Sequence, residues 1–96
     1  MNDSPIPPHE QLTIYATAWC GDCHRTKSFL DRHAVPYQWI DIDTTPGAAE
    51  LVVAINGGSH SVPTLVFTDG TTMTEPSNRA LAEKLRIDLD ATPPRR

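Results

Sequence analysis

The two cysteines of this 96-residue chain, Cys20 and Cys23, are its strongest candidates for chemistry. An alternating apolar run, 12–16, precedes them, and a run with helical spacing, 25–34, follows them. A Cys-x-x-Cys pair at such a strand-to-helix junction places its first sulfur at a helix N-terminus, where free N–H groups and the helix dipole favour an anion. Because the thiolate is the nucleophile in disulfide exchange, we predict that Cys20 is exposed and attacks disulfides. Cys23, one turn further on and more buried, can then displace what Cys20 has captured.

Composition and charge restrict the class of protein. A chain of 96 residues has room for one domain. Its net charge of -4 and its scattered Lys and Arg residues argue against nucleic-acid binding. No apolar run approaches the length needed to cross a membrane, and residues 1–5 lack the basic and apolar segments of a secretory signal. We therefore expect a cytoplasmic protein without membrane attachment, in which a cysteine pair indicates catalysis or metal binding rather than a structural disulfide.

The apolar periodicity predicts an α/β fold. Strand patterns occupy 11–16, 37–42, 64–67 and 71–74, and helix patterns follow the cysteines, Pro46 and Ser77. The order β-α-β-α-β-β-α predicts a four-stranded mixed sheet flanked by three helices, with the first two strands parallel and the last two joined by an antiparallel turn at Asp69-Gly70. We expect this domain to span 11–87, between a flexible N-terminal segment, 1–10, and a flexible C-terminal tail, 88–96.

Capping signals place two of the helices. Thr44-Thr45-Pro46 is typical of a cap followed by proline at the first helical position, so a helix is predicted from there through Ile55. Ser77 is predicted to cap the last helix, with Ala80, Leu81 and Leu85 on its inner face.

Three segments together resemble the glutaredoxin-like branch of the thioredoxin-fold superfamily: 19–23, 61–64 and Asp69-Gly70. The resemblance implies a thioredoxin fold in which Pro63 is a cis proline opposite the active cysteine. It also implies that Val62 offers its backbone to the substrate and that Trp19 forms a wall of the groove. The expected substrate-binding set is completed by Gly21, Asp22 and, at the N-terminus of the last helix, Ser77.

Within that branch the chain looks most similar to the mycoredoxins, in the segments 12–15, 19–21, 55–58, 62–64 and 76–77. This resemblance implies a monomeric enzyme that reduces mixed disulfides between proteins and mycothiol. Its expected partners are mycothiol, as co-substrate, and mycothiolated or disulfide-bonded proteins, with no bound cofactor and no metal. It favours a monothiol route, in which Cys20 takes the mycothiol and a second mycothiol releases it while Cys23 modulates the reaction.

Two departures from the pattern matter. Asp22 stands between the cysteines, where these proteins usually have an aromatic residue, and 73–78 replaces the Gly-Gly pair and acid that hold glutathione. Glutathione is therefore a poor candidate ligand. The Asp22 carboxylate suits the first helical turn but opposes a nearby thiolate, so we expect Asp22→Tyr to favour the Cys20 thiolate. Arg25 and Lys27 offset Asp22, meet an acidic partner or, the preferred interpretation, are ordinary solvated helix charges.

Three alternatives remain open from the sequence. A redoxin of the NrdH type would use both cysteines and take electrons from thioredoxin reductase. Cys-x-x-Cys-His, ending at His24, is also the haem-attachment motif, with Met73 as a distal ligand. A metal site is disfavoured because two cysteines cannot complete a tetrahedral zinc site, although a cluster shared between two chains would need only Cys20 from each.

Overall fold

The computed structural model describes residues 9–89. Within this range the chain forms the predicted four strands and three helices in the predicted order. Their bounds are β1 Thr13–Ala16, α1 Gly21–Arg32, β2 Gln38–Asp41, α2 Ala48–Ile55, β3 Thr64–Val66, β4 Thr72–Thr74 and α3 Asn78–Leu85. Most of the two segments predicted to be flexible, 1–8 of the first and 90–96 of the second, lies outside the described residues.

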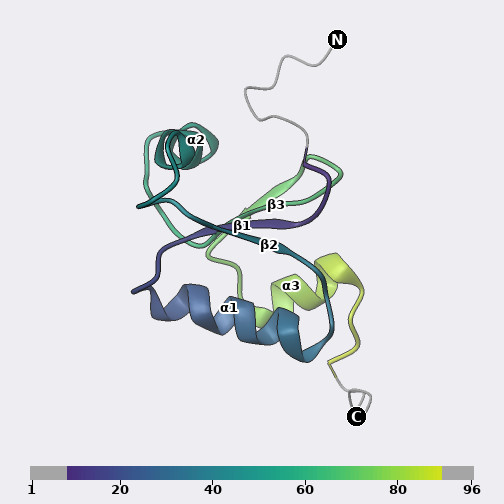
Figure 1. The fold of residues 1–96 in the computed structure, drawn as a ribbon. Coiled ribbons are helices and arrows are strands. Elements are labelled where there is room, and N and C mark those ends of the chain that lie inside the picture. Colours follow the sequence, from purple (N-terminus) through teal and green to yellow (C-terminus); the bar gives the residue numbers. More distant parts are fainter. Residues whose placement is uncertain (1–8, 90–96) are drawn as a thin grey trace.

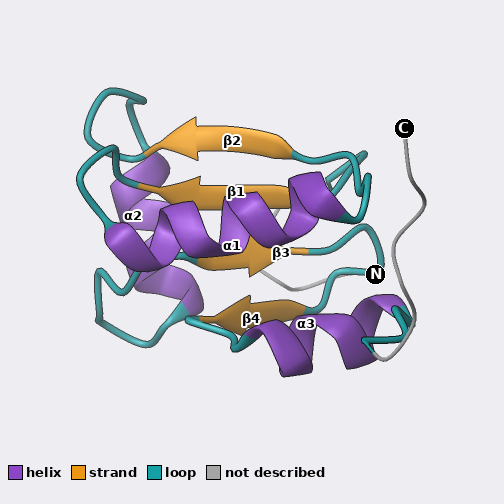
Figure 2. Cartoon of the chain, turned by 90° about the horizontal axis from the view of Figure 1, so that it is seen from below, coloured by secondary structure: helices purple, strands orange, loops and turns teal. Residues whose placement is uncertain are grey.

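The four strands form one mixed sheet in the order β2-β1-β3-β4. As the element order predicts, β1 is parallel to β2 and β3 is antiparallel to β4. The structure adds that β1 pairs with β3, also antiparallel. α1 and α3 cover one face of the sheet and α2 covers the other (Figures 1 and 2). This arrangement brings the β1–α1 junction, which carries the cysteines, next to the loop that enters β3.

The core lies on both faces of the central strand, β1, all of whose residues are buried. Ile14 and Ala16 belong to the larger cluster with Phe29, Leu30 and Leu81 from the two helices on that face. The intervening Tyr15 packs on the other face with α2. Full burial of a large apolar side chain contributes about 1.5–3 kcal/mol, so α1 is held by its core-facing side. The cysteine-bearing helix is thus anchored to the sheet by its buried face.

The structure corrects two capping predictions. Thr44 and Thr45 do not cap α2: they lie in a turn at the end of β2, in which their N–H groups donate to the Asp41 carbonyl, and Gly47 stands at the N-cap position. α2 therefore begins later, at Ala48, after Gly47, which has a positive φ of 83° and makes no side-chain cap. Ser77 does cap α3, but Ala82 rather than Ala80 joins Leu81 in its buried face. The strands are also shorter than predicted, since β1 begins only at Thr13.

Candidate active site

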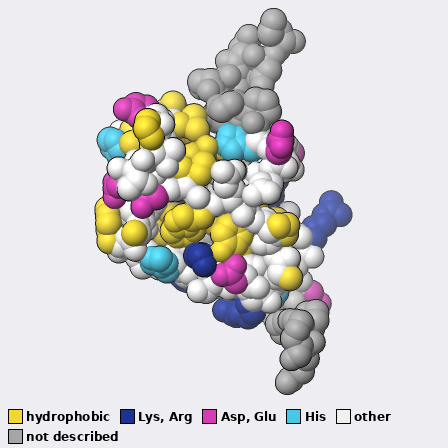
Figure 3. Space-filling view, viewed as in Figure 1, with side chains coloured by type: hydrophobic (Ala, Val, Ile, Leu, Met, Phe, Trp, Pro, Cys, Tyr) yellow, Lys and Arg dark blue, Asp and Glu magenta, His cyan; other side chains and the backbone are white. Residues whose placement is uncertain are grey.

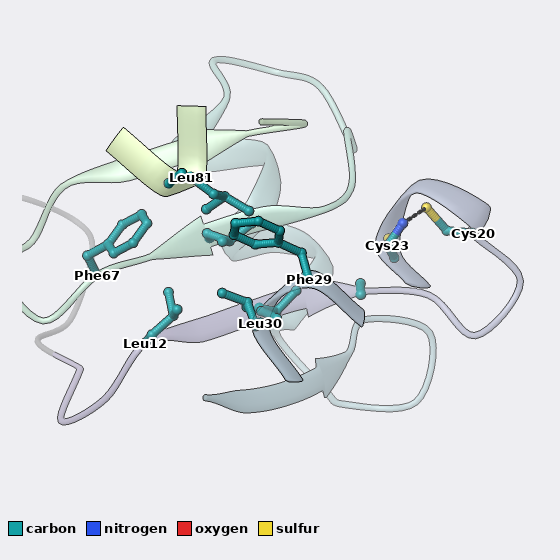
Figure 4. Packing of buried hydrophobic residues seen from close by; sticks show 11 residues of the cluster. Leu12, Cys20, Cys23, Phe29, Leu30, Phe67 and Leu81 are labelled. Carbon is teal, nitrogen blue, oxygen red and sulfur yellow. Dashed lines mark hydrogen bonds between the residues drawn. The ribbon is translucent and has the colours of Figure 1, made fainter. Parts of the chain in front are cut away.

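The cysteine pair occupies the start of α1. Cys20 is the N-cap of the helix, and its sulfur accepts a hydrogen bond from the Cys23 N–H at 3.0 Å (Figure 4). Both cysteines are free thiols. The first turn of the helix therefore points an N–H donor at the sulfur of Cys20. This hydrogen bond is stronger when the sulfur is anionic.

Cys20 is less exposed than the sequence predicts. Its relative exposure is 9%, against 0% for Cys23, so the order of the two is as expected but the prediction that Cys20 is exposed is wrong. The physical reason is the capping geometry, which turns the sulfur onto the helix and toward the Val62 carbonyl, 4.0 Å from Cys20 Sγ. An incoming disulfide must therefore reach Cys20 beside the 61–63 loop.

Cys23 is held as a neutral thiol. Burial, followed by its hydrogen bond with Cys20, raises the pKa of Cys23 to about 12, and the Thr17 backbone N–H only partly opposes this. Since the thiolate is the reactive form, Cys23 is a poor nucleophile at neutral pH in the reduced protein. The chemistry of the pair is thus strongly asymmetric.

The loop before β3 supplies the wall that faces Cys20. The Val62–Pro63 peptide bond is cis. Pro63 is fully buried, and its carbonyl accepts the Glu75 N–H at 2.8 Å, which ties the loop to the segment after β4. Val62 is partly buried and packs against both core clusters. The fold thus brings the Val62–Pro63 pair next to Cys20, from which it is separated by more than forty positions in the chain.

Arg25 joins the cysteine helix to the start of α3. Its guanidinium donates to the carboxylate of Asp22 at 3.0 Å, to the carbonyl of Pro76 at 3.0 Å and to the side chain of Asn78 at 2.6 Å. The preferred interpretation of Arg25 as an ordinary solvated charge is therefore wrong, and it does offset Asp22. Lys27 fits that interpretation, since it forms an exposed pair with Asp31. The spacing of three between Asp22 and Arg25 is the signal that points to the pair.

On the other side of the cysteines, Trp19 projects into solvent. It is 76% exposed, and its indole N–H donates to the carboxylate of Asp43 at 3.1 Å. His24 bonds the Ala18 carbonyl at 2.7 Å and stacks on Trp39 of β2. Hydrophobic side chains gather along β2, next to charged side chains over α1 (Figure 3). No local pattern in the sequence reveals the role of Asp43, because its partner Trp19 is 24 positions away.

Two other predicted site residues have plain local roles. A Cβ on Gly21 would meet nothing within 4 Å, so space does not require glycine at this position. The hydroxyl oxygen of Ser77 accepts the Ala80 N–H as the helix cap, and Ser77 is otherwise exposed near the Arg25 contacts. Its side chain is thus committed to capping, and the neighbouring Pro76 carbonyl is taken by Arg25.

Among residues 9–89, no group of three or more His, Cys, Asp or Glu side chains could hold a metal ion. None of the helices in that part of the chain is long and apolar enough to cross a membrane.

Comparisons show which known proteins this chain is similar to in sequence and in structure. The family model described as Glutaredoxin matches residues 12–72. The chain is 46% identical over 74 residues to a "Putative glutaredoxin" of Mycobacterium tuberculosis, covering 77% of this chain and 88% of that protein. It is 42% identical over 65 residues to Mycoredoxin 1 of Corynebacterium glutamicum, covering 68% of this chain and 80% of that protein. A crystal structure of a glutaredoxin from Archaeoglobus fulgidus aligns with a TM-score of 0.68 at 32% identity, covering 79% and 86% of the two chains.

Proposed function

Because this chain belongs to the glutaredoxin family and is a glutaredoxin-like thiol-disulfide oxidoreductase with a Cys-x-x-Cys pair, we propose that it reduces mixed disulfides between proteins and mycothiol. The similarity to Mycoredoxin 1 supports mycothiol as the co-substrate. The observation that carries the mechanism is the asymmetry of the pair. Cys20 caps a helix beside the Val62 carbonyl, whereas Cys23 is a buried, neutral thiol.

The proposed reaction has two exchange steps. The thiolate of Cys20 attacks the mycothiol sulfur of the mixed disulfide, a new S–S bond forms, and the protein thiolate leaves and takes up a proton. The thiolate of a second mycothiol then attacks the mycothiol sulfur bound to Cys20. This step releases oxidised mycothiol and restores the Cys20 thiolate. The second mycothiol supplies the electrons, so the protein ends as it began.

The structure supports this monothiol route over a dithiol route. In the dithiol route Cys23 must attack Cys20 Sγ as a thiolate, and burial, the largest cause of the raised pKa of Cys23, disfavours that thiolate. A mycothiol thiol in solution is not buried and forms its thiolate more easily. In this proposal Cys23 orders the start of α1 through its N–H and is not needed for turnover.

The proposed substrate contacts surround Cys20. Trp19 contributes an exposed aromatic surface, and Val62, whose peptide bond to the fully buried Pro63 is cis, forms the wall beside Cys20. Asp22 sets the local charge together with Arg25. Gly21 leaves open space at the first helical position, and Ser77 presents the start of α3. We further propose that the protein acts as a cytoplasmic monomer.

A kinetic comparison tests the proposal. The reduced protein is mixed with one model peptide linked either to mycothiol or to glutathione, with the matching thiol as reductant. Wild type and Cys23→Ser should both reduce the mycothiol adduct, and Cys20→Ser should reduce neither. Preference for the glutathione adduct would contradict the choice of thiol, and loss of turnover in Cys23→Ser would contradict the monothiol route.

The same assay distinguishes the proposed function from the alternative, a dithiol electron carrier. A protein of the NrdH type should be active only when thioredoxin reductase supplies electrons, and it should need both cysteines. The haem-attachment alternative for Cys20, Cys23 and His24 is not retained, because the glutaredoxin family accounts for the cysteine pair and His24 is engaged with Ala18 and Trp39.

A further inference from the structure

The side chain of Asn56 connects three elements beneath the 61–63 loop. Its amide N–H groups donate to the Val52 carbonyl of α2 at 3.1 Å and to the Thr64 hydroxyl of β3 at 3.0 Å. Its amide oxygen accepts the hydroxyl of Thr74, in β4, at 2.5 Å. The sequence predicts only that the helix ends near Asn56. The end of a helix does not require these three side-chain hydrogen bonds.

The chain of hydrogen bonds continues to the active-site loop. The Thr64 hydroxyl, whose acceptor site is taken by Asn56, donates to the Ser61 carbonyl at 2.8 Å. Thr64 is fully buried, so water cannot replace either partner at low cost. The orientation of the Ser61 carbonyl therefore depends on Thr64 and, one bond further back, on Asn56.

The Ser61 carbonyl and the Val62 N–H belong to one planar peptide unit. Among the described residues the cis bond is Val62–Pro63, so the Ser61–Val62 unit is trans and its C=O and N–H point in opposite directions. A carbonyl held by Thr64 consequently directs the Val62 N–H away from the Asn56 side of the loop. The next carbonyl along, that of Val62, faces Cys20 Sγ at 4.0 Å. The direction of the Val62 N–H is thus tied to the Thr64 hydroxyl.

We propose that Asn56, acting through Thr64, is a positioning residue that holds the Ser61–Val62 peptide so that Val62 can pair with the backbone of a disulfide-bearing substrate. An extended chain beside Cys20 has unpaired N–H and C=O groups, and a fixed partner lowers the cost of ordering it. The inference rests on the proposed disulfide exchange. It assigns no contact between Asn56 and the substrate.

Steady-state kinetics with a peptide mixed disulfide test this role. Asn56→Ala and Thr64→Val should raise KM about threefold to tenfold and leave kcat within about twofold. Thr64→Ser, which keeps the hydroxyl, should restore the wild-type KM. The rate at which iodoacetamide alkylates Cys20 should not change in any variant, because this small reagent needs no backbone pairing.

Thr13→Val is the matched control. Thr13 is another fully buried threonine of the sheet, and its hydroxyl donates to the Gln11 carbonyl at 3.0 Å, without a link to Ser61. Thr13→Val should lower the midpoint of thermal unfolding without raising KM, and by less than Thr64→Val, because the Thr64 hydroxyl makes two hydrogen bonds. An equal rise of KM in Thr13→Val, or an unchanged KM in Thr64→Val, would overturn the proposal.

A second measurement does not depend on turnover. A stable mixed disulfide between Cys20 of the Cys23→Ser protein and a cysteine peptide should shift the amide signal of Val62 in NMR spectra. Adding Thr64→Val should reduce that shift, and an undiminished shift would refute the positioning role. If wild type reduces no mycothiol adduct but this pattern holds, the choice of thiol fails and the positioning role stands.

Discussion

The guanidinium of Arg25 lies 3.0 Å from the carboxylate of Asp22, the residue between the two cysteines. The same guanidinium also holds the Pro76 carbonyl and the Asn78 side chain. The negative charge of Asp22 at the start of α1 is therefore offset by the Arg25 guanidinium. Pro76 and Asn78, at the start of α3, hold that guanidinium in place. The pair is partly exposed, so its influence on a neighbouring sulfur is moderate and sensitive to salt.

Removing either charge should change the reactivity of Cys20 in opposite directions. We expect Asp22→Asn to speed alkylation by iodoacetamide at pH 7, and Arg25→Met to slow it, each about twofold to fivefold at low salt. The reason is that a carboxylate disfavours the nearby thiolate and a guanidinium favours it. Alkylation rates at 0.02 M and 0.5 M salt provide the measurement. Effects of the same sign in both variants, or effects that grow with salt, would show that charge is not the cause.

Cys23 should make the protein sensitive to alkaline pH. An ordinary thiol of this kind has a pKa of 9.0, and the folded protein raises that of Cys23 to about 12, chiefly by burial. The stability that this neutral thiol retains is fully present below pH 9 and is lost as the pH rises toward 12. One such group lowers the free energy of unfolding by up to about 1.4 kcal/mol per pH unit.

Urea unfolding of the reduced protein between pH 8 and pH 11 measures this loss. Cys23→Ala should show a shallower fall of stability with pH than wild type. Burial also raises the pKa of Tyr15, so Tyr15→Phe serves as a second titrating control with the same sign. Parallel pH profiles for wild type and Cys23→Ala would contradict the prediction.

Trp19 should affect the rate of reduction of large substrates and not of small ones. Its exposed ring beside Cys20 offers contact area to a protein, and Asp43 restricts its motion. Trp19→Ala should lower kcat/KM for a protein mixed disulfide about threefold to tenfold, and leave that for a small disulfide within about twofold. Asp43→Ala should have a weaker effect of the same kind. Equal losses on both substrates would instead place Trp19 in the chemical step.

The contact between Lys84 and Asp69 should stabilise the hairpin against α3. The ammonium lies 2.8 Å from the carboxylate and 5.0 Å from the centre of the Phe67 ring. The hydrogen bond from Lys84, followed by those from Thr71, holds the pKa of Asp69 well below its usual 3.8. This contribution is present above pH 3.8 and is lost as the pH falls further.

Lys84→Met should therefore lower the midpoint of thermal unfolding at pH 7, and the difference from wild type should narrow below pH 3.8. Methionine keeps most of the apolar stem, so the comparison isolates the charge. Lys27→Met is the control, because it breaks the exposed pair with Asp31 within one helix and should change the midpoint little. If the difference in midpoint between Lys84→Met and wild type is constant with pH, the contact of Lys84 with the Phe67 ring alone would explain it.

Sequence patterns predicted the fold well because each element carries its own signal. Alternation in 12–16, the Asp69-Gly70 turn and the Ser77 cap are local, and each is confirmed where the structure describes it. The start of α2 was wrong because the Asp41 carbonyl recruits the N–H groups of Thr44 and Thr45, a competition that the Pro46 signal does not reveal.

The site was predictable only in part for a related reason. Cys20 and Cys23 are neighbours in sequence, so their helical spacing was readable. The indole bond of Trp19 and the Asn56–Thr64 bond join residues that are 24 and 8 positions apart. Such contacts depend on how the elements pack, and one sequence contains no pattern for them. The Val62–Pro63 loop was expected opposite Cys20, 42 positions away, only through the resemblance to glutaredoxins, and the structure places it there with a cis bond.

Cys20 carries the sulfur that is proposed to react, and it is also the N-cap of α1. Every change in the bonding of its sulfur is therefore also a change in how the helix begins. A thiolate is a strong acceptor for the Cys23 N–H, and a sulfur bonded to a partner is a weaker one. Amide hydrogen exchange in the first turn of α1 should thus be slowest when the protein is free and reduced, and faster while it carries a captured thiol.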